Sequence, residues 1–156
     1  MLEHLILKRI QSHTTSSKNF NPFQSAYRCY FSTESALLLA LDNIYHAIDT
    51  GSSTVLVSLN LSAAFDTIEH SVLLNRLQNS FGITGLALAW FQSYLSDRRQ
   101  FVRIGSSKSP ETPCCTGVSQ GSVLVPMLFS FYISPIAHIV SSFGLLQQQY
   151  ADDTQL

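Results

Sequence analysis

The alternation of apolar and polar positions along the chain predicts helices separated by short extended segments. Residues 1–11 place charged side chains among leucines and isoleucines, as in an amphipathic helix, and the polar residues 11–21 predict a loop. A second helix is expected over residues 33–50, because Ser32 can cap its first turn and Gly51 can end it.

The apolar residues of this second helix fall on one stripe, which predicts a face packed on the protein core. The stripe consists of Leu37, Leu41, Ile44 and Ile48. Residues 54–59 are a β-branched and apolar run that predicts a buried strand, followed by a turn at 60–66. The remaining pattern predicts helices over 71–80 and 86–95, a β-hairpin made by 99–104, 105–109 and 111–116, a helix over 121–133, and a short strand at 146–150.

Strands interspersed with helices make the expected fold class α+β, with an α/β-like order of elements. The length of 156 residues fits one domain around one core. Its composition, 46% hydrophobic and 12% charged, argues against intrinsic disorder. We therefore expect a single domain, in which residues 1–20 are an N-terminal helix and a polar loop that precede the main body.

Charge and cysteine content narrow the functional classes only slightly. A net charge of -1 gives no general attraction to a polyanion, so composition alone does not indicate nucleic acid. Three cysteines without paired spacing indicate neither a disulfide framework nor a zinc site. The N-terminus does not look like a signal peptide, so we expect an intracellular protein of the cytoplasm or nucleus that is not secreted. No protein partner is indicated.

One stretch raises the alternative of a membrane span. Residues 112–151 contain no Asp, Glu, Lys or Arg. The middle of this stretch, 123–140, is strongly apolar. Pro126 and Pro135 interrupt the run, and no basic cluster flanks it. We therefore expect a buried core helix and no membrane contact.

Two adjacent carboxylates, Asp152 and Asp153, follow the last predicted strand, where a tight turn can present them to a divalent cation. Alone, such a pair fits an ordinary polar turn, because Asp often bonds to nearby backbone. Two earlier segments change this interpretation. Residues 59–66 are Leu-Asn-Leu-Ser-Ala-Ala-Phe-Asp, and residues 117–126 are Gly-Val-Ser-Gln-Gly-Ser-Val-Leu-Val-Pro.

In this order, the segments 59–66, 117–126 and 150–153 resemble the first acidic motif, the nucleotide-pocket motif and the catalytic acidic hairpin of reverse transcriptases. Other segments are similar to the polymerases of non-long-terminal-repeat (LINE-type) retrotransposons rather than to retroviral ones. These segments are 21–28, 32–38, 65–70 and 94–98. The resemblance covers nearly the whole chain.

The resemblance implies RNA-directed DNA synthesis, in which two Mg²⁺ or Mn²⁺ ions assist transfer of a nucleotide to a primer 3'-hydroxyl. Its implied partners are an RNA template, a DNA primer and deoxynucleoside triphosphates. The implied fold is a polymerase palm with part of the fingers, an antiparallel sheet packed on helices. By motif matching, the catalytic metal ligands are Asp152 and Asp153, and the nucleotide-binding positions are Phe65, Gln120, Gly121 and Ala151.

The first catalytic aspartate of the family should stand at position 60, where this chain has Asn60. An amide offers a neutral oxygen in place of an anion, so we expect weak or absent metal binding and a catalytically dead site. Asp66 is the nearest substitute, but we expect it to cap the next helix. Ser119 replaces the family's usual Pro and Val125 its usual Gly, which predicts an altered nucleotide pocket.

Compared with the family, the chain begins after the basic fingers motifs and ends soon after Asp153, so we expect a fragment, 21–156, that lacks a thumb. A basic cluster offers weak contacts to phosphates, although four such charges more often form a solvated hairpin face. The cluster consists of Arg98, Arg99, Arg103 and Lys108. Two alternatives stay open: a non-catalytic RNA-binding remnant, and an active polymerase completed by other segments.

Overall fold

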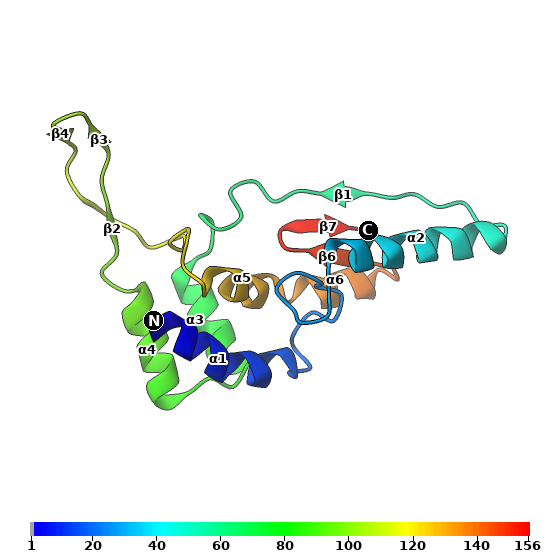
Figure 1. The fold of residues 1–156 in the computed structure, drawn as a ribbon, viewed down its shortest axis with the longest axis horizontal. Coiled ribbons are helices and arrows are strands. Elements are labelled where there is room, and N and C mark those ends of the chain that lie inside the picture. The colour runs from blue at the N-terminus through cyan, green and yellow to red at the C-terminus, as the bar shows by residue number, and fades with distance from the viewer. Residues whose placement is uncertain (1) are drawn as a thin grey trace.

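The computed structural model describes residues 2–156 and combines helices with short strands (Figure 1). Met1, the first residue of the expected N-terminal helix, lies outside the described residues. The elements are α1 (Leu2–Thr15), α2 (Thr33–Asp49), β1 (Ser58–Leu59), α3 (His70–Asn79), α4 (Gly85–Leu95), β2 (Arg99–Gln100), β3 (Arg103–Ile104), β4 (Ser107–Lys108), β5 (Thr112–Pro113), α5 (Val125–Ile133), α6 (Ile136–Ser142), β6 (Gln148–Tyr150) and β7 (Asp153–Gln155). The mixed helix and sheet content agrees with the expected fold class.

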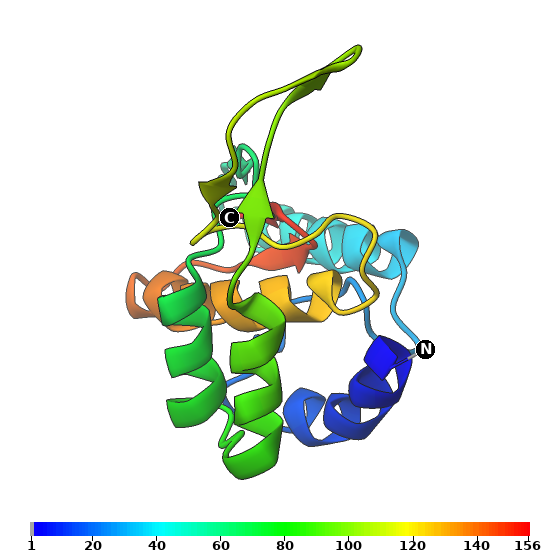
Figure 2. The same ribbon diagram turned by 90° about the vertical axis from the view of Figure 1, so that its left-hand side faces the viewer.

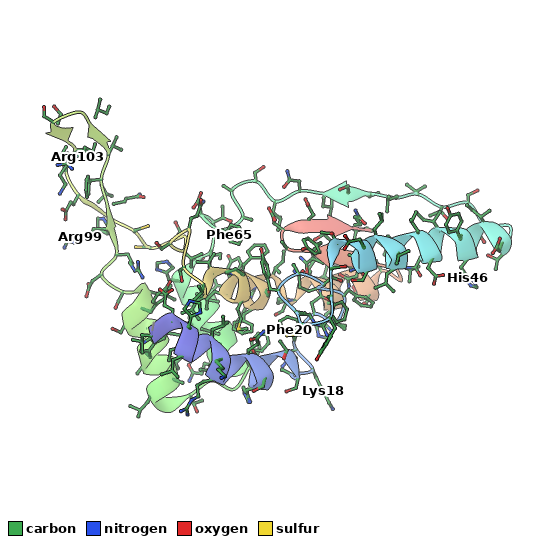
Figure 3. The ribbon with its side chains drawn as sticks, in the orientation of Figure 1. Lys18, Phe20, His46, Phe65, Arg99 and Arg103 are labelled. Atoms are coloured by element: carbon green, nitrogen blue, oxygen red, sulfur yellow. The ribbon has the colours of Figure 1, made fainter. Side chains whose placement is uncertain are left out.

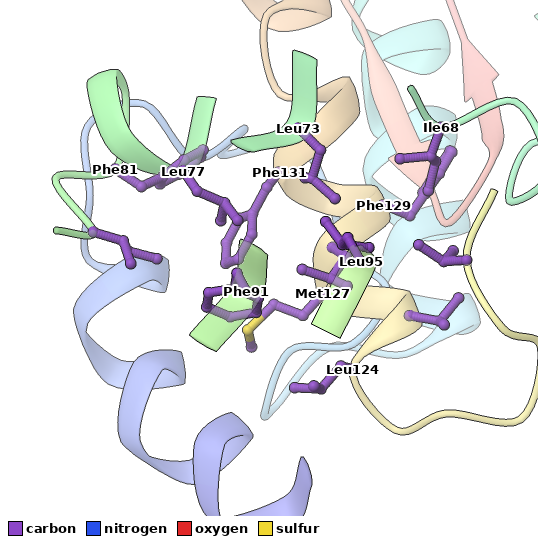
Figure 4. Packing of buried hydrophobic residues seen from close by; sticks show 14 of the residues in the cluster. Ile68, Leu73, Leu77, Phe81, Phe91, Leu95, Leu124, Met127, Phe129 and Phe131 are labelled. Carbon is purple, nitrogen blue, oxygen red and sulfur yellow. The ribbon is translucent and has the colours of Figure 1, made fainter. Parts of the chain in front are cut away.

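The largest hydrophobic core lies among α1, α3, α4 and α5 (Figure 4). Its fully buried side chains include Leu73 and Leu77 of α3, Phe91 of α4, and Leu128 and Phe131 of α5. Helix α1 covers the cluster with half-buried leucine and isoleucine side chains. Helix α5 is apolar on all sides because it lies in the middle of this cluster.

A three-stranded antiparallel sheet in the order β1-β7-β6 forms the other half of the molecule, with α2 beside β6 (Figure 1). Strands β6 and β7 make a tight hairpin that pairs Tyr150 with Asp153. The outer edge of β6 is covered by the loop before α2, through a parallel bridge between Gln24 and Gln149. The sheet therefore gathers segments from both ends of the sequence.

The predicted hairpin over 99–116 is confirmed as a two-stranded arm that projects from the body (Figures 1 and 2). β2 pairs with β5 at its base, and β3 pairs with β4 near its tip. All eight residues of these strands are exposed, so the arm adds nothing to the core.

Helix α2 begins and ends as predicted. The Ser32 side chain accepts a hydrogen bond from Ser35 N (3.2 Å), and the Ser35 hydroxyl accepts one from Ser32 N (2.8 Å), which completes a capping box. After the helix, Gly51 has a φ of +74°, a left-handed conformation that suits glycine.

Two predictions of burial are wrong. The segment 54–59 was expected as a buried strand, but only its last residues pair with β7, and Val55 is 80% exposed because no element covers it. The stripe on α2 is only partly covered: Leu41 and Ile44 are half-buried, whereas Leu37 and Ile48 are exposed. The helix lies beside β6, at the edge of the sheet.

Helix boundaries differ from the predicted ones at two places. α1 continues to Thr15, beyond the expected end of the first helix, because Thr14 and Thr15 bond their hydroxyls back to carbonyls of the preceding turn. α5 starts at Val125 rather than at Gly121, which lies in a turn with a φ of +96°. A glycine in that conformation cannot belong to a right-handed helix.

The apolar stretch Val125–Ser142 is long and apolar enough to cross a membrane by length and composition alone. In the structure half of that stretch is buried, and Leu128 and Phe129 lie in the core. Pro135 lies at the junction of α5 and α6. This arrangement agrees with a buried core helix.

Candidate active site

The register of the sheet brings Asn60 to the acidic turn. Ser58 pairs with Gln155 and Leu59 with Thr154, and the next residues along the two strands are Asn60 and Asp153. In an antiparallel pair, side chains directly opposite each other have Cβ atoms about 4.5–5.5 Å apart. Residue 60 and residue 153 are therefore neighbours, although 92 residues separate them in the sequence.

The acidic turn itself consists of Ala151 and Asp152, between the paired residues Tyr150 and Asp153. Ala151 has a φ of +55°, an uncommon conformation for a residue with a Cβ atom. Side chains alternate along a strand, so Asp153 points away from the face of its neighbour Thr154, which is buried. The Asp153 side chain is exposed and Asp152 is half-buried, which leaves both carboxylates within reach of a ligand.

The donor atoms at this turn suit one hard cation better than two. Asp152, Asp153 and Asn60 offer carboxylate and amide oxygens, the ligand type that Mg²⁺ and Mn²⁺ prefer. Two divalent cations carry four positive charges against two carboxylates, and the amide supplies no further charge. Across residues 2–156 no group of three or more His, Cys, Asp or Glu side chains is placed to hold a metal ion. The residues present therefore do not fit a pair of ions.

The second motif packs against the end of the first. Val118 N donates to Phe65 O (3.1 Å) and Gly117 N donates to Ile68 O (2.8 Å). His70 Nε2 lies 2.7 Å from Gly117 O and donates to it when the proton is on Nε2. The Phe65 ring is half-buried and meets Phe129 edge to face, with ring centroids 5.2 Å apart. Figure 3 shows Phe65 between the arm and the sheet.

Gln120 and Gly121 form an exposed turn between this contact and α5. The turn is anchored by Ser122, whose hydroxyl donates to Glu3 Oε2 (2.9 Å) and accepts from Tyr94 OH (2.9 Å). Val125, where the family usually has glycine, has no positive φ and begins α5 with its side chain buried. The backbone at Val125 is therefore not in a left-handed conformation, and the altered nucleotide pocket stays a prediction.

Asp66 does not cap α3, contrary to our expectation. The residue before the helix is Glu69, which makes no side-chain capping bond, and Asp66 is exposed in the turn before it. Asp66 instead lines a cleft of about 630 Å³ together with His70 and Ser119. The cleft reaches the base of the arm, and its lining includes Asp66 but neither Asn60 nor the acidic turn.

The four basic residues of the expected cluster lie along the arm and at its base. Arg99 and Arg103 are exposed, and Figure 3 shows both along the arm. Lys108 forms an ion pair with Glu111 (2.7 Å), while Arg98 Nε donates to Tyr94 O and its guanidinium lies over the Tyr94 ring. Arg99 and Arg103 are therefore the best placed of the four to meet a phosphate.

Two residues of the loop before α2 lie next to the acidic turn, and the sequence motifs did not indicate them. Gln24 and Tyr27 belong to the segment 21–28, which served only as a mark of family resemblance. Gln24 hydrogen-bonds to Ala151. The pKa of Tyr27 is raised, first by burial and then by the nearby Asp152 carboxylate. No charge or periodicity in the segment 21–28 indicated that Gln24 would be buried against the turn.

The sequence of the chain is similar to those of known polymerases. A family profile described as "Reverse transcriptase (RNA-dependent DNA polymerase)" matches residues 1–156. The chain is 29% identical to the "Probable RNA-directed DNA polymerase from transposon BS" of Drosophila melanogaster over 99% of its length, and 29% identical, over the same share, to the "RNA-directed DNA polymerase from mobile element jockey" of that species.

A more distant similarity, 28% identity over 83% of the chain, is to the "Retrovirus-related Pol polyprotein from type-1 retrotransposable element R2" of Popillia japonica. The chain spans 17% of the length of the two Drosophila proteins and 18% of the Popillia protein. The similarity therefore concerns one part of each of these larger proteins.

Proposed function

Because the chain belongs to the reverse transcriptase (RNA-dependent DNA polymerase) family, we propose that it is the palm, with part of the fingers, of a retrotransposon polymerase whose metal site is disabled. The full site would act on an RNA template, a DNA primer and deoxynucleoside triphosphates. In this chain the site binds one divalent cation weakly and does not sustain DNA synthesis.

The observation that carries this proposal is the pairing of Leu59 with Thr154, because the next residues along the two strands are Asn60 and Asp153. A polymerase of this family needs acids from two distant segments on one surface, and the strand pairing supports that placement. The contact of Phe65 with Val118 supports placement of the nucleotide pocket next to it. When bound, a metal pair supplies charge neutralisation on the triphosphate and a lower pKa for the attacking hydroxyl.

The inactivity follows from charge. Replacing a bridging carboxylate by an amide removes one negative charge, while the repulsion between two cations is unchanged. A deficit of about 4 kcal/mol in transition-state stabilisation would slow turnover roughly a thousandfold. Asp66 does not compensate, because it lies at the separate cleft beside the arm.

The first test is titration with Mn²⁺ of the natural chain, the variant Asn60→Asp and the double variant Asn60→Asp/Asp153→Asn. We expect Asn60→Asp to raise the affinity at least about tenfold, since a third carboxylate joins the ligand set. The double variant is the matched control, because it has the same net charge as the natural chain. Equal affinity in all three proteins would contradict the proposed metal site.

The second test uses a complete relative. In the jockey polymerase of Drosophila melanogaster, the residue aligned with Asn60 is changed to asparagine and primer extension is measured on an RNA template. We expect a rate roughly a thousand times lower, the consequence of a loss of about 4 kcal/mol. Extension at more than about a tenth of the normal rate would show that asparagine at this position does not disable the site.

The exposed arm favours a second, compatible function in binding RNA. Arg99 and Arg103 project from the body on this arm, where a phosphate backbone could reach them. Binding of single-stranded RNA without Mg²⁺ should weaken as salt rises, and Arg99→Gln/Arg103→Gln should reduce that salt dependence. RNA affinity that is identical in the double variant would remove the arm as a contact surface.

A further inference from the structure

A buried glutamine from the other end of the chain holds the backbone of the acidic turn. Gln24 is 1% exposed. Its Oε1 accepts a hydrogen bond from Ala151 N (2.9 Å), and its Nε2 donates one to Ala151 O (3.0 Å). Oε1 also accepts from Ala26 N (3.0 Å), which orients the carboxamide from its own loop. One side chain thus satisfies both backbone groups of Ala151.

These bonds fall on the one residue of the turn whose backbone is strained. Ala151 has a φ of +55° and directly precedes Asp152. A left-handed conformation is unfavourable for a residue with a Cβ atom, so it persists only where the surroundings determine it. The two bonds from Gln24 are such surroundings, and the direction of the following carboxylates depends on them.

A carboxamide suits this pair of contacts, because one planar group carries both an acceptor oxygen and a donor nitrogen. An ionised glutamate accepts hydrogen bonds but has no proton to donate to Ala151 O, and lysine and arginine donate but do not accept. Methionine has nearly the length of Gln24 but offers no comparable donor or acceptor. The contact with the turn therefore accounts for a glutamine at position 24, although Ala151 lies 127 residues further along the sequence.

A second set of buried polar contacts fixes the same loop to both strands of the hairpin. Asn21 Nδ2 donates to Gln149 Oε1 (2.9 Å), and Gln149 Nε2 donates to Thr154 Oγ1 (3.3 Å). In addition, Ser25 N donates to Gln149 O (2.9 Å). The loop is therefore an extra edge of the sheet, and Gln24 extends from that edge to the turn.

We propose that Gln24 is a positioning residue, which holds Ala151 in its left-handed conformation and thereby directs Asp152 and Asp153 towards residue 60. Its effect on metal binding rests on the function proposed above, whereas its effect on the turn does not. The two effects are measured separately.

The turn is tested with Gln24→Met, and Gln147→Met is the matched control. Gln147 is also a buried glutamine, 5% exposed, but its Nε2 donates to Ala137 O, away from the turn. The readout is amide hydrogen exchange of Ala151, measured by NMR relative to the amides of α5. We expect exchange about tenfold faster in Gln24→Met, the loss of roughly one net hydrogen bond, and no change in the control. Unchanged exchange in Gln24→Met would overturn the proposal.

A second variant, Gln24→Glu, keeps the test decisive if Gln24→Met does not fold. A protonated carboxyl group can donate to Ala151 O and accept from Ala151 N, whereas the carboxylate can only accept. Burial favours the neutral form, so mildly acidic pH should restore it. We expect the Ala151 amide signal of this variant to return to its natural position as pH falls. A signal that stays displaced at every pH at which the variant is folded would contradict the positioning role.

Metal affinity is tested in the Asn60→Asp background, where binding is strong enough to follow. Adding Gln24→Met should weaken Mn²⁺ binding about tenfold, the lower end of what loss of an outer partner of a metal ligand costs. Adding Gln147→Met should not. If Asn60→Asp itself binds no Mn²⁺, the proposed function fails, and the Ala151 amide alone decides the role of Gln24. If it binds and Gln24→Met changes nothing, Gln24 does not direct the carboxylates.

Discussion

The two halves of the molecule bury their residues in different ways. In the helical half, α1, α3, α4 and α5 interlock apolar side chains such as Leu128 and Phe131, which are fully buried. In the sheet half, formed by α2, β1, β6, β7 and the loop before α2, the fully buried side chains are polar, among them Gln24 and Gln149. The acidic turn belongs to the second half.

The two kinds of burial have different effects: apolar packing stabilises the helical half, whereas buried hydrogen bonds fix the geometry of the sheet half. Apolar burial is strong and non-directional, so the helical half can be stable without fixing any single angle. Buried hydrogen-bond networks fix geometry, but each unpaired group in them is costly. The acidic turn is positioned by such a network, and it is therefore more sensitive to a single substitution than the core beside it.

The sheet half also leaves its large apolar side chains exposed. The exposed residues are Leu37, Leu38, Leu39, Tyr45, Ile48, Val55, Leu56, Phe143, Leu145 and Leu146. Several of them line a groove of about 260 Å³ between α2 and the sheet. Exposed apolar surface of this kind promotes association, so we expect self-association to begin in the sheet half.

The largest expected effect comes from comparing two phenylalanines, one in each environment. Phe131→Ala should lower the free energy of unfolding by about 3–5 kcal/mol, because it opens a cavity in the helical core. Phe143→Ala removes a side chain that is 74% exposed and should change it by less than about 0.5 kcal/mol. Denaturant unfolding of both variants measures the difference. Similar losses would show that the two halves are packed alike.

A smaller effect on the free energy of unfolding is expected when alanine replaces either of two glycines with similar backbone angles. Gly117 has a φ of +81°, and an added Cβ would lie 3.1 Å from Asp66 O, whereas Gly51, at +74°, faces open space. Gly51→Ala should cost about 1 kcal/mol for its backbone alone, and Gly117→Ala about 2–3 kcal/mol. Equal costs, measured by thermal or denaturant unfolding, would mean that Asp66 moves aside freely.

The smallest effect is a shift in the titration of Tyr27. The pKa of Tyr27 is raised above its ordinary value of 10.0 by burial and, secondarily, by the negative charge of Asp152, which disfavours the phenolate. Asp152→Asn removes that charge, so the pKa of Tyr27 should fall while burial keeps it raised. NMR titration of the tyrosine ring carbons measures this shift, and Asp42→Asn, on α2, is the control. An unchanged pKa would place Asp152 away from Tyr27.

Local signals in the sequence predicted the ends of α2 well and the length of β1 poorly. A helix carries its own boundaries, and Ser32 and Gly51 marked both ends of α2. A strand is defined by its partner, so the apolar run 54–59 could not reveal that β1 is only two residues long. The apolar stripe on α2 failed for the same reason, because periodicity identifies a face and not the surface that will cover it.

The candidate site was predictable to the extent that motif order determines it. Placing Asn60 beside Asp153 required only that both segments match one family, and the sheet register agrees with that placement. The bonds from Gln24 to Ala151 could not be predicted, because a polar loop is normally interpreted as solvated surface. Only the folded chain shows that this loop is an edge of the sheet.

The pairing of β1 with β7 also limits how the length of the chain can vary among relatives. Residues 53–56 pair with nothing and are exposed, so an insertion or deletion there only lengthens or shortens a surface connection. Between residues 57 and 60, a change of one residue would turn every following side chain to the opposite face of the sheet. Alignments of relatives should therefore show gaps before β1 and none between it and position 60.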